Sequence, residues 1–248
     1  MIERLLVTVA HPDDETFGCG SLLAHASSRG IETVVACATR GELGEIAPGV
    51  DAEPATLGDV REAELRAAAR ELGVARVELL GFGDSGMVGE LPPGSLAAAD
   101  VEDVAAPVVA LIDDVRPDMV VTLDGSDGHR DHAAIRDGTL AALRQSTWRP
   151  ARTYLWCLPR TLLQRYTGSD VAIGTPDDDI TTVIDTTELL DRRWRAIRMH
   201  ASQAPPFDAM PPELWREFLG SERLRRIDPP WPGGPVETDP FADASARD

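Results

Sequence analysis

Short apolar segments that alternate with helical patterns restrict this chain to a small set of folds. Strands are predicted where the sequence is continuously apolar, at residues 5–10, 33–38, 77–80 and 119–123. Such runs suit a parallel sheet, which helices cover on both faces. The intervening helices are predicted at residues 16–29, 59–72, 98–115 and 132–144, and Pro107 kinks or restarts the third. The pattern therefore predicts a Rossmann-like, doubly wound, mostly parallel α/β sheet.

The later part of the chain repeats this pattern less regularly. Further strands are predicted at residues 153–157 and 181–184, a helix at 188–200 and a short helix at 211–220. From residue 228 the chain is Pro-rich and acidic and has little apolar material to bury. We therefore expect a single α/β domain over residues 1–227, with residues 228–248 as a loosely held C-terminal extension.

The charge and cysteine content limit the classes of partner. The chain has 42 acidic and 24 basic residues, every basic one an arginine, and a net charge of −18. A field of this sign repels nucleic acid and anionic membranes, although its simplest role is solubility. Cys19, Cys37 and Cys157 form no close pair, which is typical of free thiols in a reducing compartment. With only a short apolar run at the N-terminus, we expect a soluble, cytoplasmic protein without membrane insertion.

Polar residues with catalytic potential follow two of the predicted strands. His11 to Glu15 come directly after the first strand, and Asp124 and then His129 to His132 follow the fourth. Three of the five histidines of the chain lie in these two turns. Because ligands of open parallel sheets bind beyond the carboxyl ends of the strands, both turns are expected to border one site.

These residues match the ligand preferences of a catalytic zinc ion. His11, Asp14 and His132 provide two imidazoles and a carboxylate, and the set also suits Fe²⁺, cobalt or manganese. Zinc lowers the pKa of bound water from ~15.7 to ~7, which makes a nucleophile available at neutral pH. Asp13 is placed to accept the proton of that water. His129 is a candidate to stabilise the oxyanion or to protonate the leaving nitrogen, and Asp131 to fix the tautomer of an imidazole.

Each turn has a simpler interpretation as a polar turn with a helix cap. The occurrence of both turns after two strands of one sheet favours the metal site. His25 and His200 are interpreted as packed or surface histidines of helices, and Cys19 as a buried, inert thiol.

At these turns the chain resembles the PIG-L/LmbE-like N-acetylglucosaminyl deacetylase family. The first turn matches the A-H-P-D-D-E motif of that family, and the second matches its H-x-D-H motif. The agreement extends over about residues 4 to 203. Its further segments are Thr39 to Gly44 (T-x-G-E-x-G), Arg61 to Glu64 (R-x-x-E), Gly81 to Met87 (G-x-x-D-S-G-M) and His200 to Gln203 (H-x-S-Q).

The resemblance implies a Rossmann-like fold with zinc held by His11, Asp14 and His132. It also implies that Asp13 is the general base, that His129 lies near the scissile carbonyl, and that Asp131 lies behind a histidine. Arg61 and Asp84 align with positions that contact the amino-sugar substrate, and Glu42 borders the site. For Arg61 and Asp84, an intrahelical ion pair and a turn residue remain the alternatives. Homo-oligomers also fit the resemblance.

One position departs from the family pattern. In the mycothiol-pathway deacetylases a tyrosine precedes the H-x-D-H motif by two residues, whereas this chain has Asp127 there. An ionised carboxylate donates no hydrogen bond, so the oxyanion donor stays open between His129 with the metal and another group.

Three functions are compatible with these residues. The first is metal-dependent removal of an N-acetyl group from an N-acetylglucosaminyl conjugate by attack of metal-bound water. The second is cleavage of a larger acyl group by the same centre, and the third is a sugar-binding protein that holds a metal without turnover. The first turn lacks G-x-G-x-x-G, which disfavours dinucleotide binding, and the absence of lysine disfavours an aspartyl phosphotransferase.

Overall fold

The computed structural model describes residues 2–170 and 172–242. Over this part of the chain the strands form one seven-stranded sheet in the order β3-β2-β1-β4-β5-β7-β6. The first five strands of this order are parallel, and β7 is antiparallel to both of its neighbours. The strands are β1 Arg4–Val9, β2 Glu32–Cys37, β3 Arg76–Leu79, β4 Met119–Leu123, β5 Arg152–Trp156, β6 Thr182–Asp185 and β7 Ser221–Asp228.

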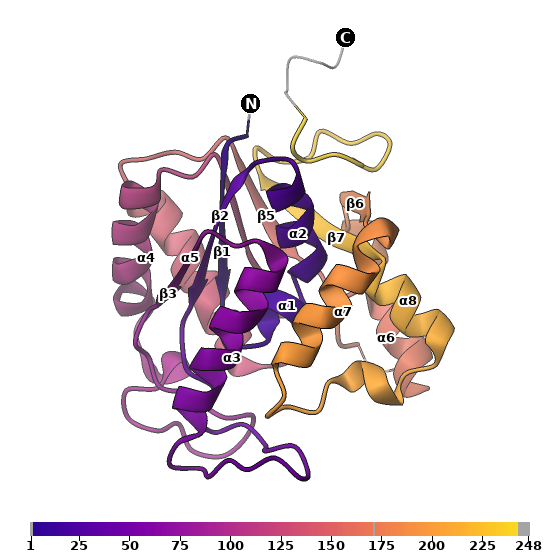
Figure 1. Ribbon diagram of the computed structural model, residues 1–248. Helices are drawn as coiled ribbons and strands as arrows, with labels where there is room; N and C mark the ends of the chain where they lie inside the picture. Colours follow the sequence, from indigo (N-terminus) through magenta and orange to yellow (C-terminus); the bar gives the residue numbers. More distant parts are fainter. Residues whose placement is uncertain (1, 171, 243–248) are drawn as a thin grey trace.

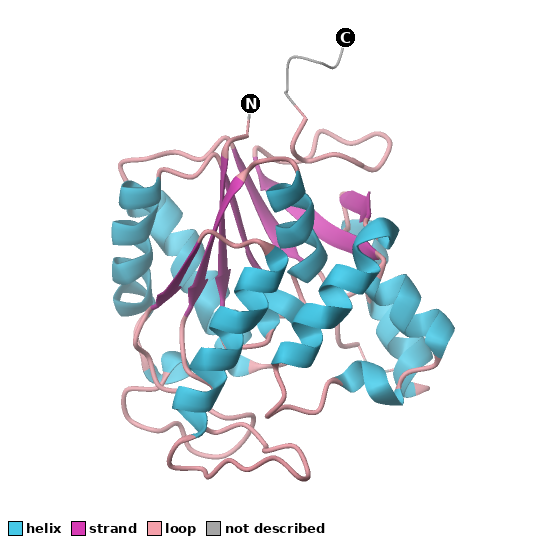
Figure 2. Ribbon diagram, viewed as in Figure 1, coloured by secondary structure: helices cyan, strands magenta, loops and turns pink. Residues whose placement is uncertain are grey.

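Helices cover both faces of the sheet (Figures 1 and 2). One layer contains α4 (Val101–Val115) and α5 (Arg130–Gln145), which pack against each other. The opposite layer contains α1 (Asp14–Phe17), α2 (Gly20–Ser28), α3 (Leu57–Leu72) and α7 (Leu190–Met199). The short helices α6 (Arg160–Thr167) and α8 (Pro212–Leu219) lie together beyond β7. The doubly wound α/β fold predicted from the sequence is thus confirmed.

The side chains of β1 show how the two layers share the core. Leu5, Val7 and Val9 are buried among the residues under α2 and α3, whereas Leu6 is buried with the residues under α4. Successive side chains of a strand point to opposite faces, so a fully apolar strand fills both cores. This is the reason that apolar runs without alternation predicted the central strands correctly.

The helix predicted over residues 16–29 is wrong, because two helices separated at Gly18 and Cys19 occupy this region. The buried guanidinium of Arg193, from α7, donates to the carbonyl oxygens of Phe17 and Gly18, at 2.6 Å each, and to that of Thr16 at 3.2 Å. Glu222 accepts from the same arginine at 3.1 Å. The break therefore depends on partners that lie far away in the sequence.

The region around α4 and the C-terminal part of the chain also differ from expectation. A 3-10 turn at Leu96–Ala98 precedes α4, which runs through Pro107 without restarting. The strand β7 was not predicted, because its sequence is rich in arginine and its apolar content is low. Residues that follow it are also held more firmly than expected, since Glu237 and Phe241 are both buried.

Among the described residues, no helix is both long enough and apolar enough to cross a membrane. Cys19, Cys37 and Cys157 are free and buried, and burial raises the pKa of each thiol. The prediction of unreactive buried thiols is consistent with both facts.

The contact between α4 and α5 depends on a glycine. A Cβ added at Gly138 would lie 2.3 Å from Cγ1 of Val104. We expect Gly138→Ala to lower the free energy of unfolding by about 1–3 kcal/mol, because overpacking outweighs the better helix propensity of alanine. Urea unfolding measures the change. In the double variant with Val104→Ala the loss should shrink, and an equal loss with and without Val104→Ala would contradict this explanation.

Candidate active site

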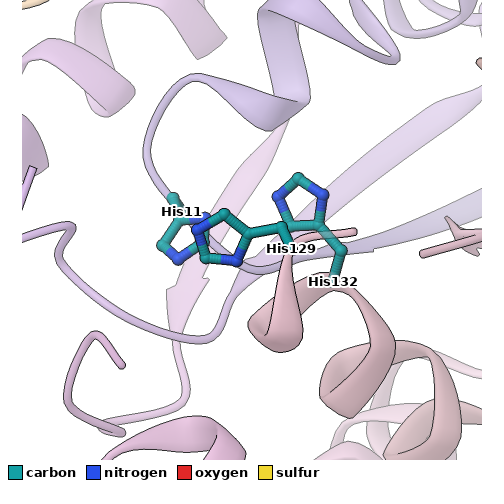
Figure 3. A group of neighbouring side chains, drawn as sticks. All are labelled: His11, His129 and His132. Carbon is teal, nitrogen blue, oxygen red and sulfur yellow. The ribbon is translucent and has the colours of Figure 1, made fainter. Parts of the chain in front are cut away.

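Two neighbouring parallel strands bring the two polar turns together. Because β1 pairs with β4, the turn after β1 and the start of α5 lie at the same edge of the sheet. The imidazole centroids of His11 and His129 are 4.6 Å apart, those of His129 and His132 are 4.7 Å apart, and those of His11 and His132 are 5.4 Å apart. Figure 3 shows the three rings gathered between the two elements.

The carboxylate of Asp14 lies between two of these imidazoles. Its Oδ2 is 3.5 Å from Nδ1 of His11, and its Oδ1 is 3.2 Å from Nε2 of His132. The backbone N–H groups of Ala10 and His11 donate to Oδ2 at 3.1 and 2.8 Å and fix its orientation. The three side chains predicted as metal ligands therefore converge on one point.

The second nitrogen of each of these imidazoles has its own carboxylate. Oδ2 of Asp131 accepts from Nε2 of His11 at 3.1 Å, and Oδ2 of Asp127 accepts from Nδ1 of His132 at 2.5 Å. Such partners fix the tautomer and leave the other nitrogen free to bind a metal. The donor set thus fits a metal ion, with Nδ1 of His11 and Nε2 of His132 directed toward Asp14.

Other combinations of nearby side chains also bring metal-binding atoms together. Within the described residues, His11, His129 and His132 form one such group, and His11, Asp84 and Asp131 form another. In the second group the carboxylates already accept hydrogen bonds from four backbone amides, which are those of Leu43, Ser85, Gly86 and Ala97. We therefore regard the second group as a hydrogen-bonded support of His11 rather than as a ligand set.

The neighbouring carboxylates favour the protonated form of both imidazoles. Burial lowers the pKa of His11, but hydrogen bonds to Asp131 and Asp14 outweigh it and raise the pKa to about 10. Burial also opposes the charge of His132, yet Asp14 and Asp127 raise the pKa of His132 to about 11. An ion that binds these nitrogens must displace the protons.

Asp13 lies beside this cluster in an unusual backbone conformation. Its φ is 136°, a value that costs free energy in any residue other than glycine. The backbone N–H of Asp13 donates to Glu15 at 2.9 Å. Burial, followed by the nearby charge of Asp14, raises the pKa of the Asp13 carboxyl to about 7. A carboxylate with this pKa can both accept and release a proton near neutral pH.

His129 is held as a neutral imidazole. It is the N-cap of α5, and its Nδ1 accepts from the backbone N–H of Asp131 at 3.2 Å. Burial, followed by the charge of His11, lowers the pKa of His129. Because Nδ1 is an acceptor, the proton of the neutral ring resides on Nε2, which is then a hydrogen-bond donor.

A polar cavity of about 520 Å³ opens over these residues. Arg61 and Asp84 line it together with the histidines and Asp13. The guanidinium of Arg61 fits closely over Gly44, where a Cβ would lie 2.1 Å from Nη1. Its Nη2 donates to the carbonyl of Glu45 at 3.0 Å, while its buried Nε has no hydrogen-bond partner among the described residues. An oxygen-rich ligand in the cavity would find a hydrogen-bond donor here.

Asp84 and Glu42 also link the two loops that border the cavity. Oδ2 of Asp84 accepts from the backbone N–H of Leu43 at 3.2 Å, and Oε1 of Glu42 accepts from that of Asp84 at 3.0 Å. Asp84 faces the cavity, whereas Glu42 contacts the loop backbone. Of the three predicted substrate contacts, Arg61 and Asp84 are therefore brought to the catalytic cluster.

The segment after α7 supports the turn that follows β1. The residue pattern alone did not indicate this supporting role. Of the two interpretations of His200, the packed histidine is confirmed, because the residue is buried and its Nε2 lies 2.7 Å from Oε1 of Glu15. Gln203 donates to the carbonyl oxygen of Pro12 at 2.7 Å and lines the cavity. The H-x-S-Q motif was the only sequence signal of this role.

The model of the family described as PIG-L, GlcNAc-PI de-N-acetylase, matches residues 6–143, and this range includes both polar turns. The chain belongs to this family. It is 35% identical over 247 residues to a 1D-myo-inositol 2-acetamido-2-deoxy-alpha-D-glucopyranoside deacetylase from Kineococcus radiotolerans, covering 81% of this chain and 68% of the relative. The protein is thus a PIG-L family deacetylase, a hydrolase with a candidate metal site.

Solved structures agree with the fold. An N,N'-diacetylchitobiose deacetylase from Pyrococcus horikoshii has a TM-score of 0.65 at 21% identity, covering 91% of this chain and 84% of that chain. GalB, the 4-carboxy-2-hydroxymuconate hydratase from Pseudomonas putida, also has a TM-score of 0.65, at 20% identity, covering 97% of this chain and all (100%) of that one. Since a deacetylase and a hydratase match equally well, the fold by itself does not specify the chemistry, which depends on the site residues.

Asp127 gives this deacetylase a second carboxylate behind an imidazole of the candidate metal site, that of His132. Asp127→Asn keeps the shape of the side chain but removes the charge that holds His132. We expect the affinity for zinc to fall by about 10-fold to 100-fold, because partners of this kind orient the ligand and raise its basicity. Competition with a chromophoric chelator measures the change. Asp51→Asn, at an exposed loop position, is the control, and equal affinities in both variants would contradict the role of Asp127.

Proposed function

We propose that this deacetylase removes the acetyl group from an N-acetylglucosaminyl-inositol conjugate, with zinc bound by His11, Asp14 and His132. The observation that carries the proposal is the convergence of these three side chains beside Asp13 and His129. The similarity to inositol-conjugate deacetylases supports the choice of substrate. Arg61 and Asp84 in the polar cavity supply a donor and an acceptor for sugar hydroxyl groups.

Each residue of the site then has a defined task. When bound, zinc supplies a Lewis acid and lowers the pKa of a coordinated water to ~7. Asp13 accepts a proton from the attacking water, since its carboxyl titrates near neutral pH. His129 donates from Nε2 to the amide oxygen as negative charge develops there, so a tyrosine at the position of Asp127 is not needed. Asp131 and Asp127 hold the two ligand imidazoles in place.

The test is acetate release from the inositol conjugate by the purified full chain. We expect zinc-dependent release, with N-acetylglucosamine alone hydrolysed more slowly because it lacks the contacts of the aglycone. Chitobiose and lipid conjugates serve as comparison substrates. Equal rates for all conjugates would contradict the inositol assignment, and no acetate from any of them would contradict the deacetylase proposal as a whole.

A further inference from the structure

A second, apolar cavity adjoins the catalytic cluster. Its volume is about 280 Å³, and Asp14, Asp127 and His132 line one side of it. The remaining lining residues are mostly aliphatic or aromatic and come from α1, the ends of β4 and β5, the segment between β5 and α6, α6, α8 and the segment before α8. They include Phe17, Leu158, Leu162, Leu163, Phe207 and Phe218. Such a cavity suits an apolar group that reaches the metal ligands.

The polar and apolar cavities share two residues, Asp14 and His132. An amide bound there extends in two directions, because its carbonyl carbon carries the nitrogen on one side and the acyl carbon on the other. With the carbonyl oxygen at the shared residues, the amino sugar lies in the polar cavity near Arg61 and Asp84. The acyl group then extends past His132 into the apolar cavity.

We propose that this enzyme also removes linear apolar acyl groups of about six to eight carbons from an amino sugar. The proposal rests on the proposed function, since it assigns the acyl-binding part of the same site. At about 30 Å³ for each water-sized group, a cavity of 280 Å³ holds about nine methylene-sized groups, far more than the methyl group of acetyl. Water adds across the amide, the C–N bond breaks, and a fatty acid carboxylate and a protonated amine leave.

An apolar aglycone fits the cavity less well than an acyl chain. The aglycone is attached to the sugar carbon next to the amide-bearing carbon and is separated from the carbonyl carbon by several bonds. The cavity begins at the metal-binding side chains themselves. A group joined directly to the carbonyl carbon therefore reaches the cavity by the shortest path.

The experiment compares glucosamines acylated with acetyl, butanoyl, hexanoyl, octanoyl and dodecanoyl groups, in the zinc-loaded protein. We expect kcat/KM for amine release to rise about threefold to fourfold for each added methylene up to six to eight carbons, and then to fall. If the acetyl compound is hydrolysed but kcat/KM stays constant or falls with acyl length, this proposal is overturned and the deacetylase function is not. If none of the compounds is hydrolysed, both the acyl-length proposal and the proposed deacetylase function are contradicted.

An octyl glycoside of N-acetylglucosamine, compared with the methyl glycoside, separates acyl from aglycone binding. We expect similar kcat/KM values for the two glycosides. A large advantage of the octyl glycoside, without an effect of acyl length, would assign the cavity to an aglycone and overturn the proposal. Calorimetry measures the binding of hexanoyl-glucosamine and of N-acetylglucosamine to Asp13→Asn. It compares the long with the short acyl group without turnover.

Substitution of Leu163, which is half-buried on α6, tests the cavity directly. Leu163→Trp fills it, and we expect the ratio of hexanoyl to acetyl kcat/KM to fall at least about tenfold. Val101→Trp, at an exposed position on α4, should keep the wild-type ratio. Leu163→Ala widens the cavity and should move the optimum to longer chains. If neither Leu163 variant changes the length preference, the acyl group binds elsewhere.

Discussion

Asp13→Asn is expected to lower kcat for deacetylation by about 10²–10⁴-fold, because the amide of asparagine accepts no proton from the attacking water. Asparagine is the most conservative choice at this position. It keeps the size and shape of the side chain at the unusual φ of 136°, so the backbone strain at this position changes little. The loss can then be assigned to the missing carboxylate.

The measurement is kcat, together with the zinc content of each protein. Zinc content should be unchanged, because Asp13 is not among the proposed ligands. Asp51→Asn provides a control for the removal of one negative charge on an exposed loop. If Asp13→Asn retained wild-type kcat, another residue would have to be the base. If it lost zinc as well, Asp13 would have to be counted among the ligands.

The same substitution should stabilise the metal-free protein at neutral and alkaline pH. The pKa of Asp13 is raised from 3.8 to about 7, so the folded state holds its proton more tightly than the unfolded state. Stability is therefore lost as pH rises from about 4 to about 7, and the full loss persists above pH 7. Three pKa units correspond to about 4 kcal/mol. Since the side chain is partly exposed, we expect asparagine to recover about 2 kcal/mol.

Urea unfolding of the metal-free proteins at pH 8 and pH 4 measures this difference. The gain from Asp13→Asn should be present at pH 8 and nearly absent at pH 4. If the stability gain were the same at both pH values, the buried charge of the Asp13 carboxylate could not be its cause. Such a result would instead indicate a change in packing or in backbone strain.

The central part of the fold was predictable because each local signal agreed with the tertiary structure. The segment of β1 is apolar throughout and is buried on both faces, so its composition alone identified it. The residues after β1 and β4 were assigned to one site from topology, and the pairing of these strands places them together. The sequence therefore identified the side chains of the site and the edge of the sheet at which they meet.

Interactions between distant residues account for the features that were not predicted. At the break between α1 and α2, Arg193 binds the free carbonyl oxygens, and Glu222 of β7 forms an ion pair with the same arginine. Neither residue is marked by any periodic pattern. Asp127 appeared in the sequence only as a missing tyrosine, whereas its hydrogen bond to His132 becomes visible only when the turn is folded. Sequence patterns report burial well and report pairing of buried charges poorly.

Removal of the metal should abolish deacetylation, and the affinity for the metal should depend steeply on pH. In the metal-free protein, carboxylate partners raise the pKa of His11 to about 10 and that of His132 to about 11, despite burial. Both imidazoles therefore carry a proton at pH 6–8 that zinc must displace. Release of two protons makes the apparent affinity rise by about 100-fold for each pH unit in this range.

Competition with a chelator at pH 6, 7 and 8 measures this slope, and calorimetry in two buffers of different ionisation enthalpy counts the released protons. Asp127→Asn should release fewer protons, because His132 then loses one of the two carboxylates, Asp14 and Asp127, that raise its pKa. His25→Ala, on α2 and outside the polar cavity, should behave like the wild type. A zinc affinity that does not change with pH would mean that His11 and His132 are not the ligands. Turnover that survives complete removal of the metal would mean that Asp13 and His129 act without it.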